Sequence, residues 1–256
     1  MRWYWIGDGP ADAGSNMARD LALLDLAAER GAGFVRTYSW APHTLSFGAN
    51  EPALKRYDRA EIEERGLAVV RRPTGGRAVW HAEELTYSVT APDGTFGSLQ
   101  QSYHAIHTIL LASLQSLGAD LALADAEIGP SDLDAGACFA APVGGEVVSA
   151  LGKVVGSAQL RERGALLQHG SILLGNQQEL VAAITLGEPP KSNAAALSRL
   201  LGRPVRPGQV ATAIMTTFEA RLGRLIPLDH ELRTALDERA ATHRPKFLDP
   251  EWTWRR

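Results

Sequence analysis

The chain has 256 residues, of which 45% are apolar and 21% are charged, and its formal net charge is −3 at pH 7. This length suits one large domain or two small ones, and the composition is ordinary for a soluble globular protein. Because the charges nearly balance, nothing favours nucleic acid or an anionic membrane as a partner, and an anionic ligand needs locally placed basic groups.

The first predicted helix covers residues 15–31. Apolar side chains recur there every three or four positions, Ser15 or Asn16 can cap its start, and Gly31 can end it. Short extended segments separated by Pro and Gly follow, and they are predicted to be strands. Their sequences are FVRTYSW, TLSFGA, LAVVRRPT, RAVW and LTYSVTAP.

A second helix is predicted over residues 102–118, with His107 at the edge of its apolar stripe as a packed or half-exposed side chain. Residues 146–174 are extended again, as a hairpin followed by a further strand. The last third is predicted to be helical, around residues 178–186, 193–201, 208–223 and 229–241. Clusters of strands interrupted by helices without strict alternation indicate an α+β fold.

Cys138 is the only cysteine, so the chain cannot form an internal disulfide, and nothing indicates an oxidising compartment. The N-terminus has no apolar segment of signal-peptide length, and no apolar run is as long as a membrane span. We therefore expect a cytoplasmic protein. The seven histidines are scattered, without cysteine or carboxylate partners at ligand spacing, so no metal site is expected.

Residues 71–77, RRPTGGR, combine three arginines with a Gly-Gly turn. Gly75 and Gly76 allow the backbone to approach a ligand closely, and their N–H groups lie between guanidinium groups. This arrangement suits an anion or a polarised carbonyl. A tight turn with solvated arginines explains the same residues equally well.

Two later segments combine polar residues with strand-like surroundings. Lys153 begins an apolar strand that Gly156 and Ser157 interrupt, which makes it either a solvated lysine or a cation for a carbonyl or phosphate oxygen. Residues 168–171 are a polar interruption of a strand that is otherwise apolar, and such an interruption needs hydrogen-bond partners or a function. His169 is therefore either a satisfied core histidine or a site residue.

Cys138 lies in a loop with Ala, Pro and Gly around it, without the regular apolar spacing of a core element. Loops carry function more often than packing does. A reactive thiol needs nearby cations or oriented N–H groups, and Lys153 and the Gly-Gly turn can supply them only if the fold brings these segments together. From the residues alone, an apolar filler and a nucleophile are about equally supported.

Three motifs in this order resemble the biotin/lipoate protein ligase superfamily, and within it the cysteine-dependent octanoyltransferases. The motifs are RRPTGGRAVWHAEELTYSV, CFAAP and LGKVVGSAQLRERGALLQHGSILL. With NMARDLALL and RTYSWAPHTLSFGANEP, the similarity covers residues 14–175, and DPEWTW near the end resembles the close of the ligases' catalytic domain.

The resemblance implies an α+β fold with a mixed β-sheet flanked by helices, as in the catalytic domains of biotin protein ligase and lipoate ligase, and a single catalytic domain over residues 1–256. It also implies that Cys138 accepts the acyl group and that Lys153 is the pocket lysine. The other site residues that it implies line one acyl tunnel. They are Arg72, Thr74, Gly75, Gly76, Arg77, His81, Gly156, Ser157, Ala158, Gln159, His169 and Gly170.

The activity implied by the resemblance is transfer of an octanoyl group from octanoyl-acyl carrier protein, through a thioester on Cys138, to the lysine of a lipoyl domain. The acceptor would be the glycine cleavage H protein or a 2-oxoacid dehydrogenase E2. Thioester exchange is nearly isoenergetic and aminolysis runs downhill, so no cofactor is expected. Lys153 and N–H groups near Gly76 or Ser157 are expected to stabilise the oxyanion. We expect a monomer.

The acceptor lysine must attack as a neutral amine, which requires a base, and His169 and His81 are the candidates. The chain departs from the family pattern at two places. Ala82 stands where an acidic residue usually follows the histidine, and Gly144–Gly145 replace bulkier residues. Both changes concern the pocket or the docking of a protein partner.

The main alternative is an ATP-dependent lipoate–protein ligase, which would bind ATP and Mg²⁺. Arg77 stands where the ligase motif has its third glycine, and Gln168 where the ligases usually have the first of two histidines. Both differences favour the transferase. An amidotransferase that moves octanoyl between lipoyl domains, and a non-catalytic acyl-binding module, remain as further alternatives.

Overall fold

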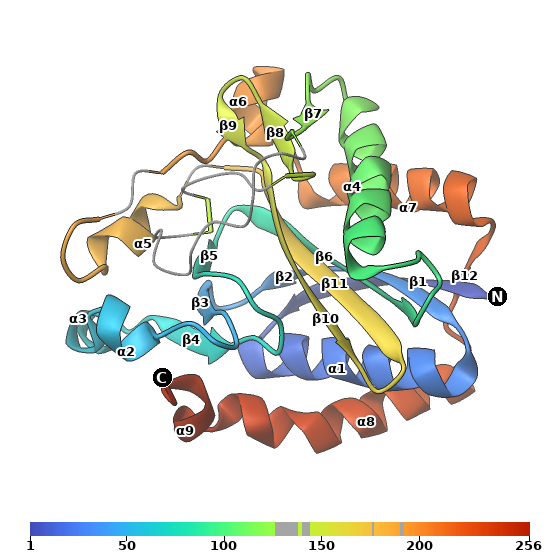
Figure 1. Cartoon of the computed structure of the whole chain (residues 1–256), viewed down its shortest axis with the longest axis horizontal. Helices are drawn as coiled ribbons and strands as arrows, with labels where there is room; N and C mark the ends of the chain where they lie inside the picture. The colour runs from blue at the N-terminus through green and yellow to red at the C-terminus, as the bar shows by residue number, and fades with distance from the viewer. Residues whose placement is uncertain (126–137, 140–143, 176, 190–191) are drawn as a thin grey trace.

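A six-stranded mixed β-sheet forms the centre of the computed structural model, which describes residues 1–125, 138–139, 144–175, 177–189 and 192–256. The strand order is β10-β11-β6-β2-β1-β12 (Figure 1). β1 is parallel to β2 and to β12, and the other neighbouring pairs are antiparallel. The strands are β1 (Trp3–Ala11), β2 (Gly33–Trp40), β6 (Glu84–Pro92), β10 (Val155–Glu162), β11 (Ala165–Leu173) and β12 (Leu225–Pro227).

Two pairs of helices cover the two faces of this sheet (Figure 1). α1 (Ala13–Arg30) and α8 (His230–Leu248) lie on one face, and α4 (Leu99–Gln115) and α7 (Pro207–Leu222) lie on the other. Side chains of β2 alternate between the two apolar clusters, since Phe34 and Tyr38 pack with α1 and α8 while Val35 packs with α4 and α7. Helices packed on both faces of one mixed sheet confirm the predicted α+β fold.

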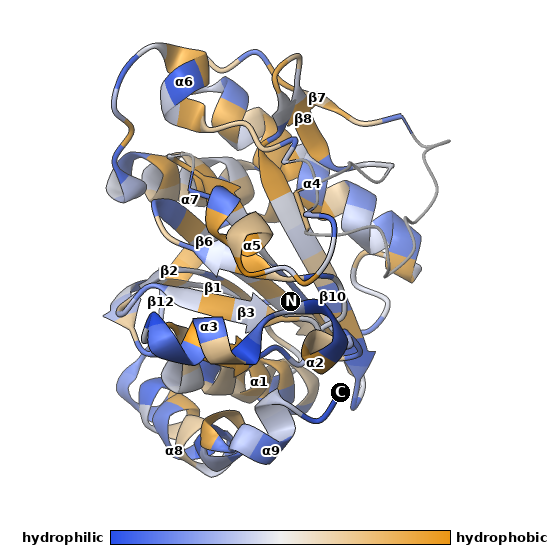
Figure 2. Cartoon of the chain, turned by 90° about the vertical axis from the view of Figure 1, so that its left-hand side faces the viewer, coloured by the Kyte–Doolittle hydropathy of each residue, from blue (hydrophilic) through white to orange (hydrophobic). Residues whose placement is uncertain are grey.

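Shorter elements surround one end of the central sheet. β3 (Thr44–Phe47), β4 (Ala68–Arg71) and β5 (Val79–His81) form one small sheet, and β7 (Ala122–Leu123), β8 (Val147–Ser149) and β9 (Gly152–Lys153) form another. The remaining helices are α2 (Ala53–Arg56), α3 (Arg59–Glu64), α5 (Glu179–Ala183), α6 (Leu197–Leu201) and α9 (Pro250–Thr253). Hydrophilic residues are frequent on the outer helices α3 and α8 (Figure 2).

The start of the first helix differs from the sequence prediction. The side chain of Asp12 accepts a hydrogen bond from the Ser15 N–H and caps the helix, so the proposed caps Ser15 and Asn16 lie inside it. Asn16 is fully buried and its amide donates to the carbonyls of Ala11 and Ser39. The predicted end at Gly31 is confirmed by its left-handed backbone.

The second helix also begins earlier than predicted, because Ser98 and Gln101 form a capping box. His107 on this helix is fully buried, with no exposed area, whereas the periodicity predicted a position at the edge of the helix's apolar stripe. The predicted hairpin over 146–159 exists as β8 and β9, and β10 then leaves it to pair with β11.

The sequence prediction missed β1 and β12. Glycine and proline within Trp3–Ala11 weaken its strand pattern, and its parallel pairing with β2 and β12 supplies the order that the local sequence lacks. The last long helix also continues through Pro245 to Leu248. Within the part of the chain that the structure describes, no helix is both long and apolar enough to cross a membrane.

Candidate active site

Cys138 and Lys153 lie together, although 15 positions separate them in the sequence. The Lys153 ammonium is 3.7 Å from the Cys138 sulfur and donates a 2.8 Å hydrogen bond to the Cys138 carbonyl. Its side chain is 1% exposed, and its Nζ forms a 2.7 Å ion pair with Glu146, which is 3% exposed. A buried cation beside a thiol favours the thiolate form, which is the nucleophile.

The backbone around Lys153 is fixed on both sides. Its N–H donates to the Asn193 carbonyl, and its own carbonyl accepts from the N–H of Ala195. The N–H of Cys138 donates to the carbonyl of Ala78, at the start of β5. Main-chain hydrogen bonds therefore hold the lysine and the cysteine in place from two different segments, residues 193–195 and Ala78.

The sulfur lies directly against the first residues of β10. A β-carbon placed on Gly156 would be 3.0 Å from the Cys138 sulfur and 3.0 Å from the ring of Phe139. Glycine at this position therefore makes room for the thiol. The glycine that interrupts the predicted strand is therefore the place where the thiol approaches the backbone.

A narrow inner cavity of about 30 Å³ begins at Cys138 and lies between β10, β11 and the Gly-Gly turn. This volume has room for about one water molecule, so side chains must move to admit an eight-carbon chain. Most of the residues predicted for the acyl tunnel line it. They are Arg72, Gly76, His81, Cys138, Gly156, Ser157, Ala158, His169 and Gly170.

A wider outer cleft of about 1140 Å³ opens on the other side of the same wall. Gly76, Ser157 and Ala158 line both spaces, and Gly75 and Gln159 line the cleft only. A molecule in the cleft therefore contacts three of the residues that also line the inner cavity beside Cys138.

The arginines of the 71–77 turn are buried instead of solvated. Arg72 donates to the carbonyls of Ser46, Gly75 and Arg77, and burial lowers the pKa of its guanidinium although electrostatic interaction with Cys138 opposes the shift. Arg71 donates to three further carbonyls, those of Gly48, Glu51 and Thr253. These guanidinium groups hold the turn together, and an anion would have to compete with main-chain carbonyls for them.

Arg77 and Thr74 lie apart from the reacting sulfur. Arg77 is 6% exposed and its Nη1 has no hydrogen-bond partner, but it does not line the inner cavity. Thr74 is fully buried, and its hydroxyl is 2.6 Å from Nε2 of His169. Gly76 has a φ of +87°, a backbone conformation that favours glycine.

Both candidate bases are histidines with buried partners. His169 Nδ1 is 2.8 Å from the carboxylate of Asp20, and its Nε2 faces Thr74, so both ring nitrogens are engaged. Burial raises the pKa of Asp20, but the His169 hydrogen bond and the Arg36 charge lower it further than burial raises it. This arrangement fits a histidine held in place by its neighbours.

His81 has a different environment. Its Nε2 is 2.7 Å from the Ser46 hydroxyl, its ring stacks on Trp40 at 4.1 Å, and its Nδ1 has no hydrogen-bond partner. Burial lowers the pKa of His81 although the Glu84 carboxylate, 3.7 Å away, favours its protonation. His81 is therefore the candidate base with one ring nitrogen, Nδ1, that makes no hydrogen bond and faces a carboxylate instead.

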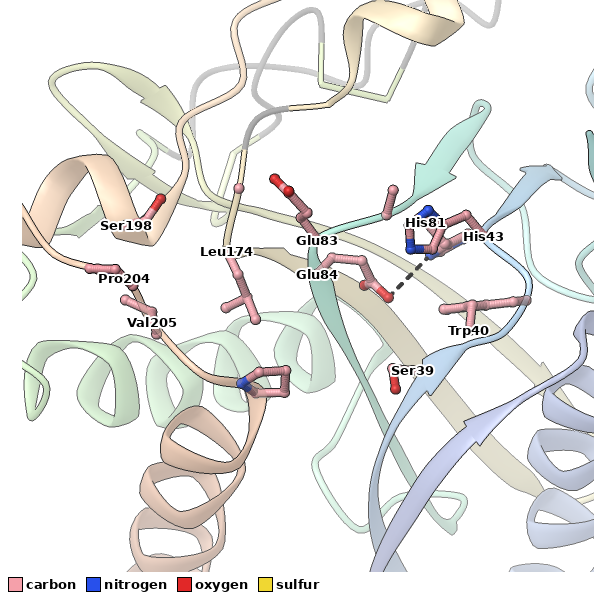
Figure 3. A pocket seen from close by; sticks show the side chains of 13 residues that line it. Ser39, Trp40, His43, His81, Glu83, Glu84, Leu174, Ser198, Pro204 and Val205 are labelled. Carbon is pink, nitrogen blue, oxygen red and sulfur yellow. Dashed lines mark ion pairs between the residues drawn. The ribbon is translucent and has the colours of Figure 1, made fainter.

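A third space, of about 480 Å³, adjoins the inner cavity, and Figure 3 shows the side chains that line it. Trp40 and His81 line both spaces and form the partition between them. His43, Glu83 and Glu84 surround its polar side, with His81 and Glu84 facing one another (Figure 3).

Sequence reasoning missed several residues of this site. Glu146 contacts Lys153, Tyr87 contacts Ser157, and Asp20 contacts His169, and none of these three partners was predicted. His107 was predicted at a helix edge. Burial is the property that these side chains share, with Asp20 and His107 in helices, Tyr87 in β6 and Glu146 directly before β8, but only the contacts reveal it. Within the described residues, no group of three or more His, Cys, Asp and Glu is placed to hold a metal ion.

Residues 12–219 match the family described as "Lipoyl protein ligase A/B catalytic domain". The chain is 39% identical over 274 residues to the octanoyltransferase LipM of Kyrpidia tusciae, and the match covers 99% of each chain. It is 33% identical over 276 residues to the octanoyltransferase LipM of Lysinibacillus sphaericus, also over 99% of each. The crystal structure of lipoate-protein ligase A bound with ATP superposes with a TM-score of 0.80 at 19% identity, over 99% of each chain.

Proposed function

Because this chain belongs to the lipoyl protein ligase A/B catalytic domain family, we propose that it transfers an octanoyl group to the lysine of a lipoyl domain through a thioester on Cys138. Full-length similarity to octanoyltransferases supports the reaction. The observation that carries the residue assignment is the 3.7 Å approach of the buried Lys153 ammonium to the Cys138 sulfur.

The first half-reaction moves the acyl group onto the enzyme. The Cys138 thiolate attacks the carbonyl carbon of an octanoyl thioester, the new C–S bond forms, the C–S bond of the donor breaks, and the donor leaves as its thiolate. The ammonium of Lys153 stabilises the thiolate before the attack and the oxyanion during it. One thioester replaces another, so this step needs no ATP.

The second half-reaction transfers the acyl group to a lysine amine. The amine attacks the octanoyl-Cys138 carbonyl, the C–N bond forms, and the C–S bond breaks to give an amide and the free thiol. An amide is more stable than a thioester, so the second half-reaction runs downhill. His81 is the proposed base for this step because its ring lines the inner cavity and its Nδ1 makes no hydrogen bond, with the Glu84 carboxylate 3.7 Å away.

The chemistry of the two half-reactions defines the partners. We assign octanoyl-acyl carrier protein as the donor and the lipoyl domain of a glycine cleavage H protein or a 2-oxoacid dehydrogenase E2 as the acceptor. The outer cleft, which shares a wall with the inner cavity, is wide enough for the arm that carries the thioester. The proposal includes a monomeric enzyme in the cytoplasm, with one domain over residues 1–256 and no cofactor.

Intact-mass measurement tests the proposal directly. The wild-type protein is incubated with octanoyl-acyl carrier protein without ATP, beside Cys138→Ala, and a lipoyl domain is then added. We expect one octanoyl group on the wild type only, and its loss as the lipoyl domain gains it. Modification of the lipoyl domain by Cys138→Ala, dependent on ATP and free octanoate, would replace the transferase by a ligase.

A further inference from the structure

Ser157 occupies the wall that the inner cavity and the outer cleft share. Its hydroxyl has two neighbours within hydrogen-bond distance, Nε2 of His107 at 2.8 Å and the phenol oxygen of Tyr87 at 2.6 Å. A hydroxyl has one proton to donate and two lone pairs to accept with. The direction of these two bonds therefore decides what Ser157 can still offer to a substrate.

The backbone carbonyl of Gly145 fixes the direction of the first bond. It lies 2.7 Å from Nδ1 of His107, and because a carbonyl can only accept, Nδ1 must carry the proton. Burial lowers the pKa of His107 to about 3, so the ring is neutral at physiological pH. A neutral ring protonated at Nδ1 has an unprotonated Nε2, which accepts a hydrogen bond from the Ser157 hydroxyl.

The second bond then has only one possible direction. The Ser157 hydroxyl uses its one proton in the hydrogen bond that it donates to His107, so the phenol of Tyr87 must donate to Ser157. The side-chain amide of Gln168 donates to the same phenol oxygen at 2.9 Å, which agrees with this direction. One lone pair of the Ser157 oxygen remains unused, at a position that lines both the cavity and the cleft.

We propose that His107 is a positioning residue for the second half-reaction, in which it orients the Ser157 hydroxyl to accept an N–H of the attacking lysine amine. This inference rests on the proposed function. The hydrogen bond turns the nitrogen lone pair toward the octanoyl carbonyl. The C–N bond then forms, the C–S bond breaks with its electron pair on sulfur, and the surplus amine proton ends on the Cys138 thiolate.

The environment of His107 fits positioning. The ring centroids of His107 and Tyr103 are 4.2 Å apart in an edge-to-face contact, and Glu146 accepts a hydrogen bond from Tyr103. The positive charge of Lys153 also lowers the pKa of His107, after burial. A cation nearby and complete burial both disfavour protonation of the imidazole. A permanently neutral acceptor keeps the Ser157 hydroxyl in one orientation throughout the catalytic cycle.

Measuring the two half-reactions separately tests the inference. Rapid-quench mass spectrometry gives the rate of octanoyl-Cys138 formation from octanoyl-acyl carrier protein. The isolated octanoyl-enzyme, mixed with a saturating lipoyl domain, gives the rate of transfer. For His107→Leu, which removes the acceptor, we expect transfer to slow by about tenfold to a hundredfold while acylation stays within about twofold.

His107→Gln supplies the rescue, because its amide oxygen reaches the place of Nε2, and we expect it to recover most of the transfer rate. Ser157→Ala is expected to lose transfer as His107→Leu does, and the double variant to lose no more. The matched control is Ser113→Ala, a buried serine on the same helix whose hydroxyl bonds only to the Ile109 carbonyl. It is expected to leave both rates unchanged.

The outcomes separate the two proposals. A wild-type enzyme that forms no octanoyl-Cys138 refutes the proposed function and this inference with it. A wild-type enzyme that completes both steps, with His107→Leu transferring at the same rate, overturns only the role of His107. An equal slowing of acylation and transfer in His107→Leu, without rescue by His107→Gln, also overturns it, because it marks a structural defect.

Discussion

Two glycine-containing segments, the turn at 71–77 and the strand segment at 152–159, hold buried cations near the inner cavity, and the two cations have different neighbours. In residues 71–77, Arg72 donates to three main-chain carbonyls and so fixes the shape of the turn. In residues 152–159, the Lys153 ammonium faces a thiol and a carboxylate. The guanidinium has five donors in a rigid plane, which suits several carbonyls, whereas the ammonium is a compact charge that suits one reacting atom.

We infer from this comparison that residues 71–77 mainly build the pocket and that residues 152–159 carry the proposed chemistry. The turn at 71–77 is packed tightly, since a β-carbon on Gly48 would clash with the carbonyl of Gly76. Beside Lys153, the glycine at 156 makes room for the sulfur itself. A change in the first turn should therefore act on stability, and a change in the second on the rate.

The largest effect is expected for Lys153→Met, which keeps the apolar stem and removes the charge. Octanoyl-Cys138 formation should slow by about a hundredfold to a thousandfold, because the thiolate and the oxyanion lose their cation. The rate is measured by rapid-quench mass spectrometry, with a thermal unfolding curve to show that the variant is folded. A loss smaller than about threefold would contradict the role of Lys153.

Arg72→Met should act mainly on stability. The carbonyls of Ser46, Gly75 and Arg77 lose their donor in a buried place, which costs about 3 kcal/mol of unfolding free energy in total. Urea unfolding measures this. The acylation rate of the folded fraction should fall far less than in Lys153→Met, and an equal fall would show that both cations act on the sulfur.

Adjacent glycines of the first turn give a matched pair. Gly76→Ala places a side chain at a φ of +87° and should cost about 1–3 kcal/mol of unfolding free energy. A β-carbon on Gly75 would meet nothing within 4 Å, so Gly75→Ala should change the unfolding free energy by less than about 0.5 kcal/mol. Equal effects of the two substitutions on the urea midpoint would mean that backbone strain is not what Gly76 avoids.

The smallest effect concerns the pH dependence of stability. The unfolded chain protonates His107 near its ordinary pKa of 6.5, while burial holds the folded pKa at about 3, so acid favours the unfolded state. Between pH 7 and pH 5.5 this group should remove about 1 kcal/mol of stability. Over the same pH range, the unfolding free energy of His107→Gln should fall by about 1 kcal/mol less than that of the wild type. Urea midpoints at the two pH values measure this difference. His81, whose pKa is also lowered, contributes to both proteins alike.

The motifs in the sequence identified most of the inner cavity. Arg72, Gly76, Gly156 and His169 were predicted from the glycine turns and the polar strand interruption, and all line the space that begins at Cys138. The role of Arg72 was not predictable, since the sequence does not show that three carbonyls surround it. The assignment of one domain, the absence of a cofactor and the catalytic roles stay predictions.

Local patterns within the sequence determined the long helices, most strands and the α+β class, because helix and strand periodicity depends on neighbours a few positions apart. The resemblance of its motifs added the family. Only the tertiary structure decided that Lys153 meets Cys138, that Asp20 meets His169 over 149 positions, and that His107 meets Ser157 over 50. Such contacts form where separate strands and helices pack at one end of a sheet, and spacing along the chain carries no record of that packing.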